Sequence, residues 1–260
     1  MGTVFRFPAR SALVGLAVLW LFAWLTLSDP IGRLSTSVRQ DLLVRSAHHG
    51  FAVRNILIEG RENTDPGELK EVVGLSWGDP IFGFDTGDLR ARVEALSWVR
   101  RARVERRLPD TVFIRLEERI PLALWQIDGG LRLIDEGGAI LTAQNLGRFQ
   151  SLPLVVGPGA HETAREILSL VEAEPVLRNR VAAFVRVGQR RWDLKLTNGL
   201  VLKLPERGME LALRRAAQSQ SREGIFDRGL VAVDLREPDR MILRTTPPPE
   251  DTQTLARKEP

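Results

Sequence analysis

The sequence predicts an α+β protein whose folded part follows a single membrane-spanning helix. Three observations carry this prediction. Residues 11–28 hold no charged side chain, residues 51–120 follow the order strand, helix, helix, strand, strand, and residues 121–246 alternate short strands with two helices. Strands grouped as hairpins with interspersed helices favour a mostly antiparallel sheet in this last region.

The apolar run of residues 11–28 is long enough to cross a bilayer. Eighteen helical residues span about 27 Å, close to the roughly 30 Å hydrocarbon core. Arg10 precedes the run and Asp29-Pro30 follows it. A cleaved signal peptide is the alternative, but the run is bulky and no small-x-small cleavage site follows it. We therefore expect a tail of residues 1–10, an anchor of residues 11–28 and a juxtamembrane stalk of residues 29–50.

The composition excludes several kinds of chemistry. The chain contains no cysteine, so it has no disulfide, no thiolate nucleophile and no cysteine-based metal or iron–sulfur site. Lys and Arg number 37 against 33 Asp and Glu, which gives a formal charge of only +4. The sequence predicts no catalytic, cofactor-binding or metal-binding residue.

Residues 51–120 read as one small α/β unit. Residues 53–60 form a predicted strand, and Asp65-Pro66 predicts the start of a helix that ends at Gly74. Asp85 is the predicted cap of a second helix, with Leu89 on its apolar face. Two strands follow, residues 99–107 and 111–118, joined by a hairpin at residues 108–110. In the second of these strands Val112, Ile114 and Leu116 share one face, and Phe113 lies on the other.

Residues 121–246 contain further strands separated by glycines. The Asn198-Gly199 pair predicts a two-residue hairpin turn with positive φ angles. A helix near the end places Leu211, Ala212 and Arg215 on one side. Residues 247–260 are too polar to pack and are predicted to be disordered. The predicted strands are residues 122–127, 131–134, 139–142, 183–187, 192–196, 200–204, 230–235 and 241–245, and the predicted helices are residues 162–172 and 208–222.

Several segments, taken in order, resemble the FtsQ/DivIB family of bacterial cell-division proteins. They are residues 53–60, 98–104, 107–112, 118–125, 191–199 and 233–236. The resemblance implies a POTRA domain over residues 51–120 and a β domain over residues 121–246. It implies a single-pass protein of the inner membrane, with its N-terminus in the cytoplasm, both domains in the periplasm and a concentration at the division septum. It also implies a scaffold without enzymatic activity.

The same resemblance implies partners and a place where they bind. FtsB and FtsL are the expected partners, together with components of septal peptidoglycan synthesis, and the scaffold would link early and late division proteins. In relatives FtsB adds a strand to the sheet edge near the C-terminus, and the matching strand here is residues 241–245. Ile242 is predicted to supply an outward N–H there. The predicted partner-binding residues are Arg190, Arg191, Arg236, Glu237, Met241, Ile242, Leu243, Arg244 and Thr245.

Two other functions are open to this sequence. A POTRA-containing component of outer-membrane assembly or secretion is one. A membrane-anchored aspartic protease is the other, because Asp85-Thr86-Gly87 matches the catalytic turn of such enzymes. Asp88 would oppose a shared proton there, and a helix cap explains Asp85 more simply.

Residues 100–107 form the densest basic run, with five arginines. Strand alternation divides these side chains between two faces, so a nucleic-acid site is not predicted. A solvated strand or a patch near anionic lipid is the favoured interpretation. The sequence likewise indicates no small-molecule ligand.

Overall fold

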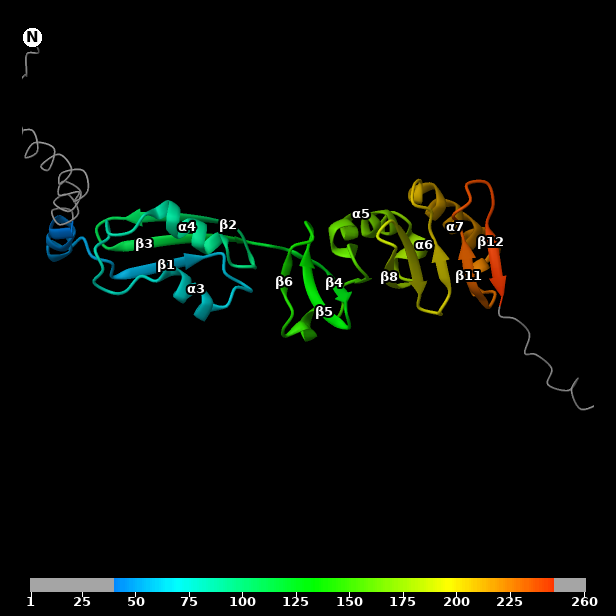
Figure 1. The fold of residues 1–260 in the computed structure, drawn as a ribbon, viewed down its shortest axis with the longest axis horizontal. Coiled ribbons are helices and arrows are strands. Elements are labelled where there is room, and N and C mark those ends of the chain that lie inside the picture. The colour runs from blue at the N-terminus through cyan, green and yellow to red at the C-terminus, as the bar shows by residue number, and fades with distance from the viewer. Residues whose placement is uncertain (1–39, 246–260) are drawn as a thin grey trace, which may run out of the picture. The chain divides into compact units, whose positions relative to one another are not determined.

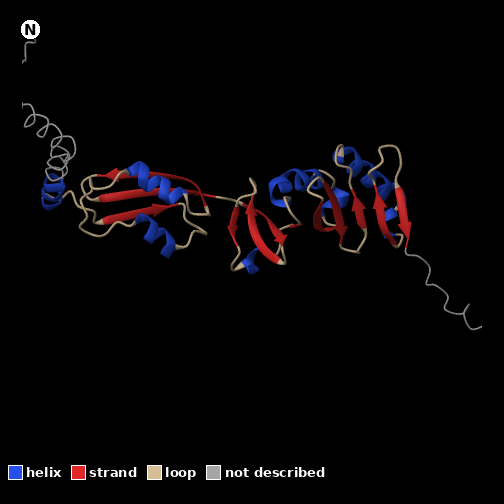
Figure 2. Ribbon diagram, viewed as in Figure 1, coloured by secondary structure: helices blue, strands red, loops and turns tan. Residues whose placement is uncertain are grey.

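The computed structural model describes residues 40–245 and confirms an α+β protein (Figures 1 and 2). The chain divides into two compact units. Among the described residues, the first comprises 40–96 and Arg101–Glu117, and the second comprises Ser97–Arg100 and 118–245. No helix within residues 40–245 is long and apolar enough to cross a membrane. The predicted anchor, residues 11–28, and the predicted disordered tail lie outside the described residues.

The first unit contains a three-stranded sheet with two helices. A short helix of residues 40–48 precedes it. The strand order is β1-β3-β2, and β1 runs parallel to β3. A three-residue connection joins β2 to β3, as the predicted hairpin requires. The elements are β1 (Asn55–Glu59), α3 (Pro66–Val73), α4 (Thr86–Glu94), β2 (Val99–Arg107) and β3 (Thr111–Glu118).

Both helices of the first unit begin at the predicted capping aspartates. Asp65 accepts hydrogen bonds from the backbone N–H groups of the second and third helical residues, and α3 ends at Gly74 with a φ of 59°. Asp85 caps α4 in the same way, accepting from Gly87 N (2.7 Å) and Asp88 N (3.0 Å). These backbone hydrogen bonds lower the pKa of Asp85. Asp85 therefore has the capping role that its sequence context favoured.

The core of the first unit is larger than strand alternation predicts. Val112, Ile114 and Leu116 are buried as expected. Phe113, predicted on the opposite face, is also buried, with only 2% of its surface exposed. The guanidinium group of Arg107 lies 3.5 Å from its ring centroid. Arginine thus covers the second face of β3, which is why Phe113 is buried on a face that sequence alternation assigns to solvent.

The second unit is built on a nine-stranded sheet. Its order is β12-β11-β10-β9-β8-β7-β4-β5-β6. The strands are β4 (Pro121–Ile127), β5 (Gly130–Asp135), β6 (Ile140–Thr142), β7 (Leu154–Val156), β8 (Val181–Val187), β9 (Arg191–Leu196), β10 (Val201–Lys203), β11 (Leu230–Asp234) and β12 (Ile242–Thr245). The helices are α5 (Ala160–Glu172), α6 (Pro175–Arg178) and α7 (Met209–Glu223), with 3₁₀ turns η1 (Leu146–Phe149) and η2 (Ile225–Asp227).

The sheet is mixed, with antiparallel pairing in the majority. Five neighbouring pairs are antiparallel and three are parallel. The strand β7, which was not predicted from the sequence, makes two of the three parallel pairings because it lies between β4 and β8. The short helix α6 was missed as well. Both elements are too short to show a periodic pattern.

The helices α5, α6 and α7 pack on one face of this sheet and bury its main core. Trp192, Leu194, Leu202 and Val233 contribute from the strands. The buried side of α7 differs from the prediction, because Leu211 is exposed. Ala212 is buried as predicted, and Leu213, Ala216, Ala217 and Gln220 complete that side.

The hairpin between β9 and β10 forms with a different turn from the one predicted. Of the pair, Gly199 alone has a positive φ, at 88°. Asn198 instead uses its side chain, donating to Phe226 O (2.8 Å) and accepting from Leu200 N (3.2 Å). The asparagine therefore ties the hairpin to η2 rather than supplying a left-handed turn residue.

Candidate partner-binding edge

The strand β12 stands at one end of the nine-stranded order, and within residues 40–245 it pairs with β11 alone (Figure 1). All four of its residues are exposed. The register joins Asp234 to Ile242 and Val233 to Leu243. An edge strand presents one row of main-chain donors and acceptors that no neighbour satisfies.

The hydrogen bonds of β10 and β11 determine which residues of β12 present that row. Leu235 N donates to Lys203 O at 2.9 Å, so the N–H and C=O groups of Leu235 face β10. Neighbouring residues of a strand point these groups to opposite sides, so those of Asp234 face β12. Its antiparallel partner Ile242 must then face β11. The outward groups of β12 therefore belong to Leu243 and Thr245.

This geometry corrects one prediction. Ile242 was expected to supply the outward N–H of the edge, but that group points into the sheet toward β11. Side-chain alternation adds a second distinction. Met241 packs against the main core, and Leu243 lies opposite the core residue Val233. Ile242 and Arg244 lie on the other face of the sheet, which carries Asp234.

The loop between β11 and β12 is held by two arginines. Arg236 donates to both carboxylate oxygens of Asp234, at 2.8 Å and 2.6 Å. These hydrogen bonds lower the pKa of Asp234, whose exposed fraction is 4%. Arg215 of α7 donates to the carbonyl oxygens of Glu237 and Pro238. Arg236 therefore supports the loop internally, although its side chain stays 41% exposed.

The predicted residues Arg190 and Arg191 lie at the turn from β8 into β9. Arg190 is exposed, and its backbone N–H donates to Val187 O at 3.3 Å. Arg191 shares a strand face with Asp193, whose pKa burial raises. Three nearby cations act in the opposite direction on that pKa, namely Arg191, Lys203 and Arg236.

The structure thus brings most of the predicted residues to one end of the sheet. The strand pairings put the start of β9, the end of β11 and the start of β12 together there. Asp193, Lys203 and Asp234 also belong to this group, although they are not among the residues predicted from the sequence. A usable signal was present, because each is a charged residue placed between apolar residues of a short strand.

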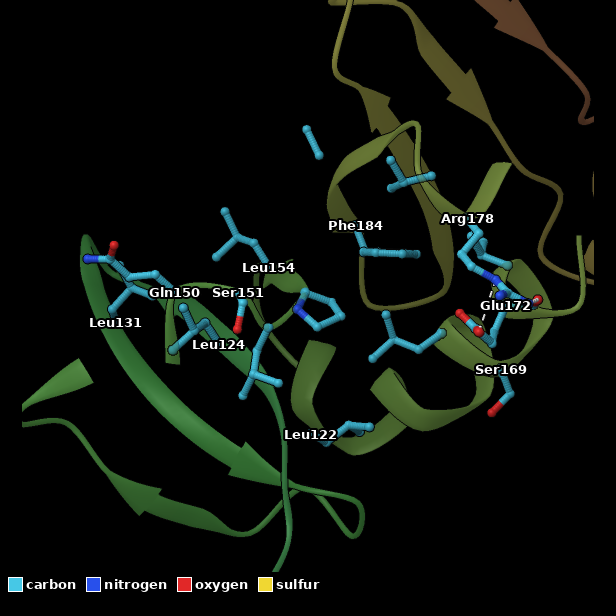
Figure 3. Close-up of a pocket in the computed structure, with 16 residues that line it drawn as sticks. Leu122, Leu124, Leu131, Gln150, Ser151, Leu154, Ser169, Glu172, Arg178 and Phe184 are labelled. Carbon is cyan, nitrogen blue, oxygen red and sulfur yellow. Dashed lines mark hydrogen bonds and ion pairs between the residues drawn. The ribbon is translucent and has the colours of Figure 1, made fainter. Parts of the chain in front are cut away.

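A separate apolar cavity of about 710 Å³ opens beside β4, β7, β8 and α5 (Figure 3). Leu124, Leu154 and Phe184 line it. At its edge Glu172 and Arg178 form an ion pair of 3.0 Å, so each charge is neutralised by the other. The walls suit an apolar side chain rather than an ionic group.

Comparison with known proteins agrees with this architecture. Residues 51–119 match a family model described as POTRA domain, FtsQ-type, and residues 123–236 match one described as Cell division protein FtsQ/DivIB, C-terminal. The chain is 40% identical to Cell division protein FtsQ of Caulobacter vibrioides (strain NA1000 / CB15N) over 212 residues, which cover 82% of this chain and 70% of that protein.

A second relative is matched over more of its length. Cell division protein FtsQ of Rickettsia felis (strain ATCC VR-1525 / URRWXCal2) is 33% identical over 240 residues, which cover 92% of this chain and 90% of the relative. The two family models follow each other along the chain in the order that the two units take. The chain belongs to the FtsQ/DivIB family of cell division proteins.

Proposed function

We propose that this protein is a non-enzymatic scaffold of the divisome. Residues 11–28 anchor it in the inner membrane, residues 1–10 lie in the cytoplasm, and the two domains lie in the periplasm at the septum. The β domain recruits FtsB, and FtsL with it, and so links early division proteins to septal peptidoglycan synthesis. Its work is binding, and β12 is the binding edge.

The single observation that carries this proposal is the outward main-chain row of Leu243 and Thr245, which no other strand of the described part of the chain pairs with. An extended segment of FtsB would add there as a further strand, because strand addition satisfies those donors and acceptors. The exposed side chains of β12 would then select the segment. Ile242 and Arg244 would meet it on one face, and Leu243 on the other.

The cations near this edge support an acidic partner segment. Arg190, Arg191 and Arg236 lie at the end of the sheet where β12 begins, and each keeps exposed surface. Asp193 and Asp234 balance part of that charge. Opposite charges between the β domain and FtsB would set the position of the added strand and speed association more than they would raise affinity.

The test replaces the outward donor and leaves the pairing with β11 in place. In Leu243→Pro the edge loses one N–H, and the ring obstructs an added strand. Loss of one hydrogen bond of about 1.4 kcal/mol corresponds to about tenfold weaker binding of the purified FtsB–FtsL pair by the full chain in detergent. Leu243→Val, which keeps the N–H, is the matched control and should bind within a few-fold of the unmodified chain.

Ile242→Pro separates edge binding from folding. It removes a donor that faces β11, so it should loosen β12 itself and raise the amide exchange of residues 230–245. Leu243→Pro should leave the exchange of β11 unchanged. Unaltered FtsB affinity in a folded Leu243→Pro variant would rule out strand addition at β12.

A further inference from the structure

The POTRA domain exposes three large apolar side chains at the end where β1 begins. Trp77 is 80% exposed, Leu108 is 56% exposed and Phe82 is 40% exposed. We refer to these three residues as the end patch. Isolated exposed apolar residues are ordinary on a protein surface, so what matters is whether the three lie together and are held in place.

Backbone hydrogen bonds fix the loop that carries Trp77 and Phe82 against the start of the domain. Val53 N donates to Asp79 O (2.8 Å), and Gly78 N donates back to Val53 O (2.8 Å). Ile81 N donates to Phe51 O at 3.0 Å. The ring of Phe82 lies 5.8 Å from that of Phe51. Trp77 is therefore presented by an ordered loop.

The arginine-rich strand β2 holds the same loop from its other side. Arg106 donates to Ile81 O at 2.9 Å and also to Phe84 O. Leu108 follows at the end of β2, two residues before Asp110. Because Arg54 N donates to Asp110 O at 2.8 Å, the turn that carries Leu108 lies beside the start of β1. The end patch therefore gathers at one end of the domain.

Exposed cations border the end patch. Arg54 precedes β1, and Arg107 ends β2 with its guanidinium over Phe113. Among the acids nearby, Asp79 already accepts from Ser76 N (2.7 Å) and Asp110 from the Thr111 hydroxyl (2.9 Å). Glu105 lies 3.8 Å from Arg107 in an ion pair between two partly exposed side chains. An aromatic and aliphatic surface bordered by arginine matches the composition of segments that rest on anionic membranes.

The end patch also lies at the part of the domain that the chain enters first. The helix of residues 40–48 leads directly into it, since Phe51 N donates to Ser46 O at 3.0 Å (Figure 1). Eleven residues separate position 40 from the predicted anchor, a reach of at most about 40 Å even when extended. The membrane surface therefore lies within reach of this end of the domain.

We propose that the end patch rests on the anionic lipid surface of the membrane that holds the chain. Trp77 and Phe82 enter the headgroup region, and Arg54 and Arg107 contact lipid phosphates. The POTRA domain is thereby held at the bilayer surface. This inference rests on the anchor of residues 11–28, and its test separates the two.

The absence of cysteine makes the test direct. Trp77→Cys in the full chain gives a single site for a nitroxide spin label, and Ala95→Cys at the far end of α4 gives an exposed control site in the same domain. Each labelled protein is reconstituted at one copy per nanodisc, in phosphatidylglycerol with phosphatidylethanolamine or in phosphatidylcholine alone. Collision rates with oxygen and with a water-soluble nickel chelate report the depth of the label.

In the anionic nanodiscs we expect the ratio of oxygen to nickel collisions to be several-fold higher at position 77 than at position 95. At position 77 we expect this ratio to be lower in phosphatidylcholine nanodiscs than in the anionic ones. Equal ratios at both positions would overturn the proposal. Protection of position 77 from both reagents would also overturn it, because that pattern indicates a protein contact.

Two further measurements test the end patch and the anchor separately. With Trp20 and Trp24 replaced by phenylalanine, brominated lipid should quench part of the fluorescence of the full chain, and this quenching should disappear in Trp77→Phe, because Trp98, Trp125 and Trp192 are buried in the folded domains. Absence of quenching in the chain that retains Trp77 contradicts the proposed role of the end patch. Extraction of the full chain from membranes by alkaline carbonate would instead contradict the anchor.

Discussion

The ion pair between Arg236 and Asp234 decides whether Arg236 supports the edge or contacts the partner. Arg236→Ala removes two hydrogen bonds, of 2.8 Å and 2.6 Å, from a carboxylate that is 4% exposed. Hydrogen bonds to a charged group contribute about 1.5–3 kcal/mol. Because the arginine side chain is 41% exposed, solvent screens the pair and the whole loss should stay within that range.

Amide hydrogen exchange of the full chain in detergent measures this loss locally. The predicted range corresponds to roughly 10- to 100-fold faster exchange over residues 230–245. Arg240→Ala, an exposed arginine of the same loop, is the control and should change exchange little. In Asp234→Asn/Arg236→Ala the exchange should return toward the unmodified rate, because a neutral amide costs less to bury than an unpaired carboxylate.

The refuting result is specific. If Arg236→Ala leaves the exchange of residues 230–245 within twofold of the unmodified chain, the ion pair does not stabilise the edge. If that same variant weakens FtsB binding, Arg236 acts as a partner contact. Weaker binding together with faster exchange, both reversed in the double variant, identifies a supporting residue.

Three further predictions concern the aspartates. Because folding lowers the pKa of Asp234, the ionised carboxylate contributes its full stability to the β domain above pH 3.8, and this contribution is lost as the pH falls through the folded-state pKa. Thermal melts at decreasing pH should show this loss of stability, and the loss should be smaller in Arg236→Ala. Since burial raises the pKa of Asp193, Asp193→Asn should raise the melting temperature at pH 7, and a lower one would contradict that burial penalty. Asp85→Asn should preserve both folding and division because asparagine also caps helices, whereas Asp85→Ala should destabilise α4; division lost in a folded Asp85→Asn variant would restore the protease hypothesis.

Local signals in the sequence predicted much of this fold. The caps at Asp65 and Asp85 depend on residues two and three positions away, so a single chain segment contains the whole interaction. Strand alternation located β3 and most strands of the β domain for the same reason. It did not indicate that Phe113, on the opposite face of β3, is buried, because the arginines that cover this ring come partly from another strand.

Elements that depend on distant neighbours were harder to predict. The strand β7 has three residues and forms because β4 and β8 lie on either side of it. The sequence predicted Asn198 as a turn residue with a positive φ angle, yet its side chain donates a hydrogen bond to the backbone of Phe226, 28 positions away. The charged group of Asp193, Lys203 and Asp234 likewise becomes one cluster only when β9, β10 and β11 pair.

The sequence by itself determined the family, the two-part organisation and the presence of a strand near residue 245, because composition, order and alternation are properties of one chain read along its length. The family resemblance already predicted that this strand is an edge, and the tertiary structure decided that Leu243 rather than Ile242 presents the outward donor. Strand alternation alone leaves that choice open. Pairing with β11, which is itself oriented by β10, removes that ambiguity because each hydrogen-bonded neighbour fixes which side the next one faces.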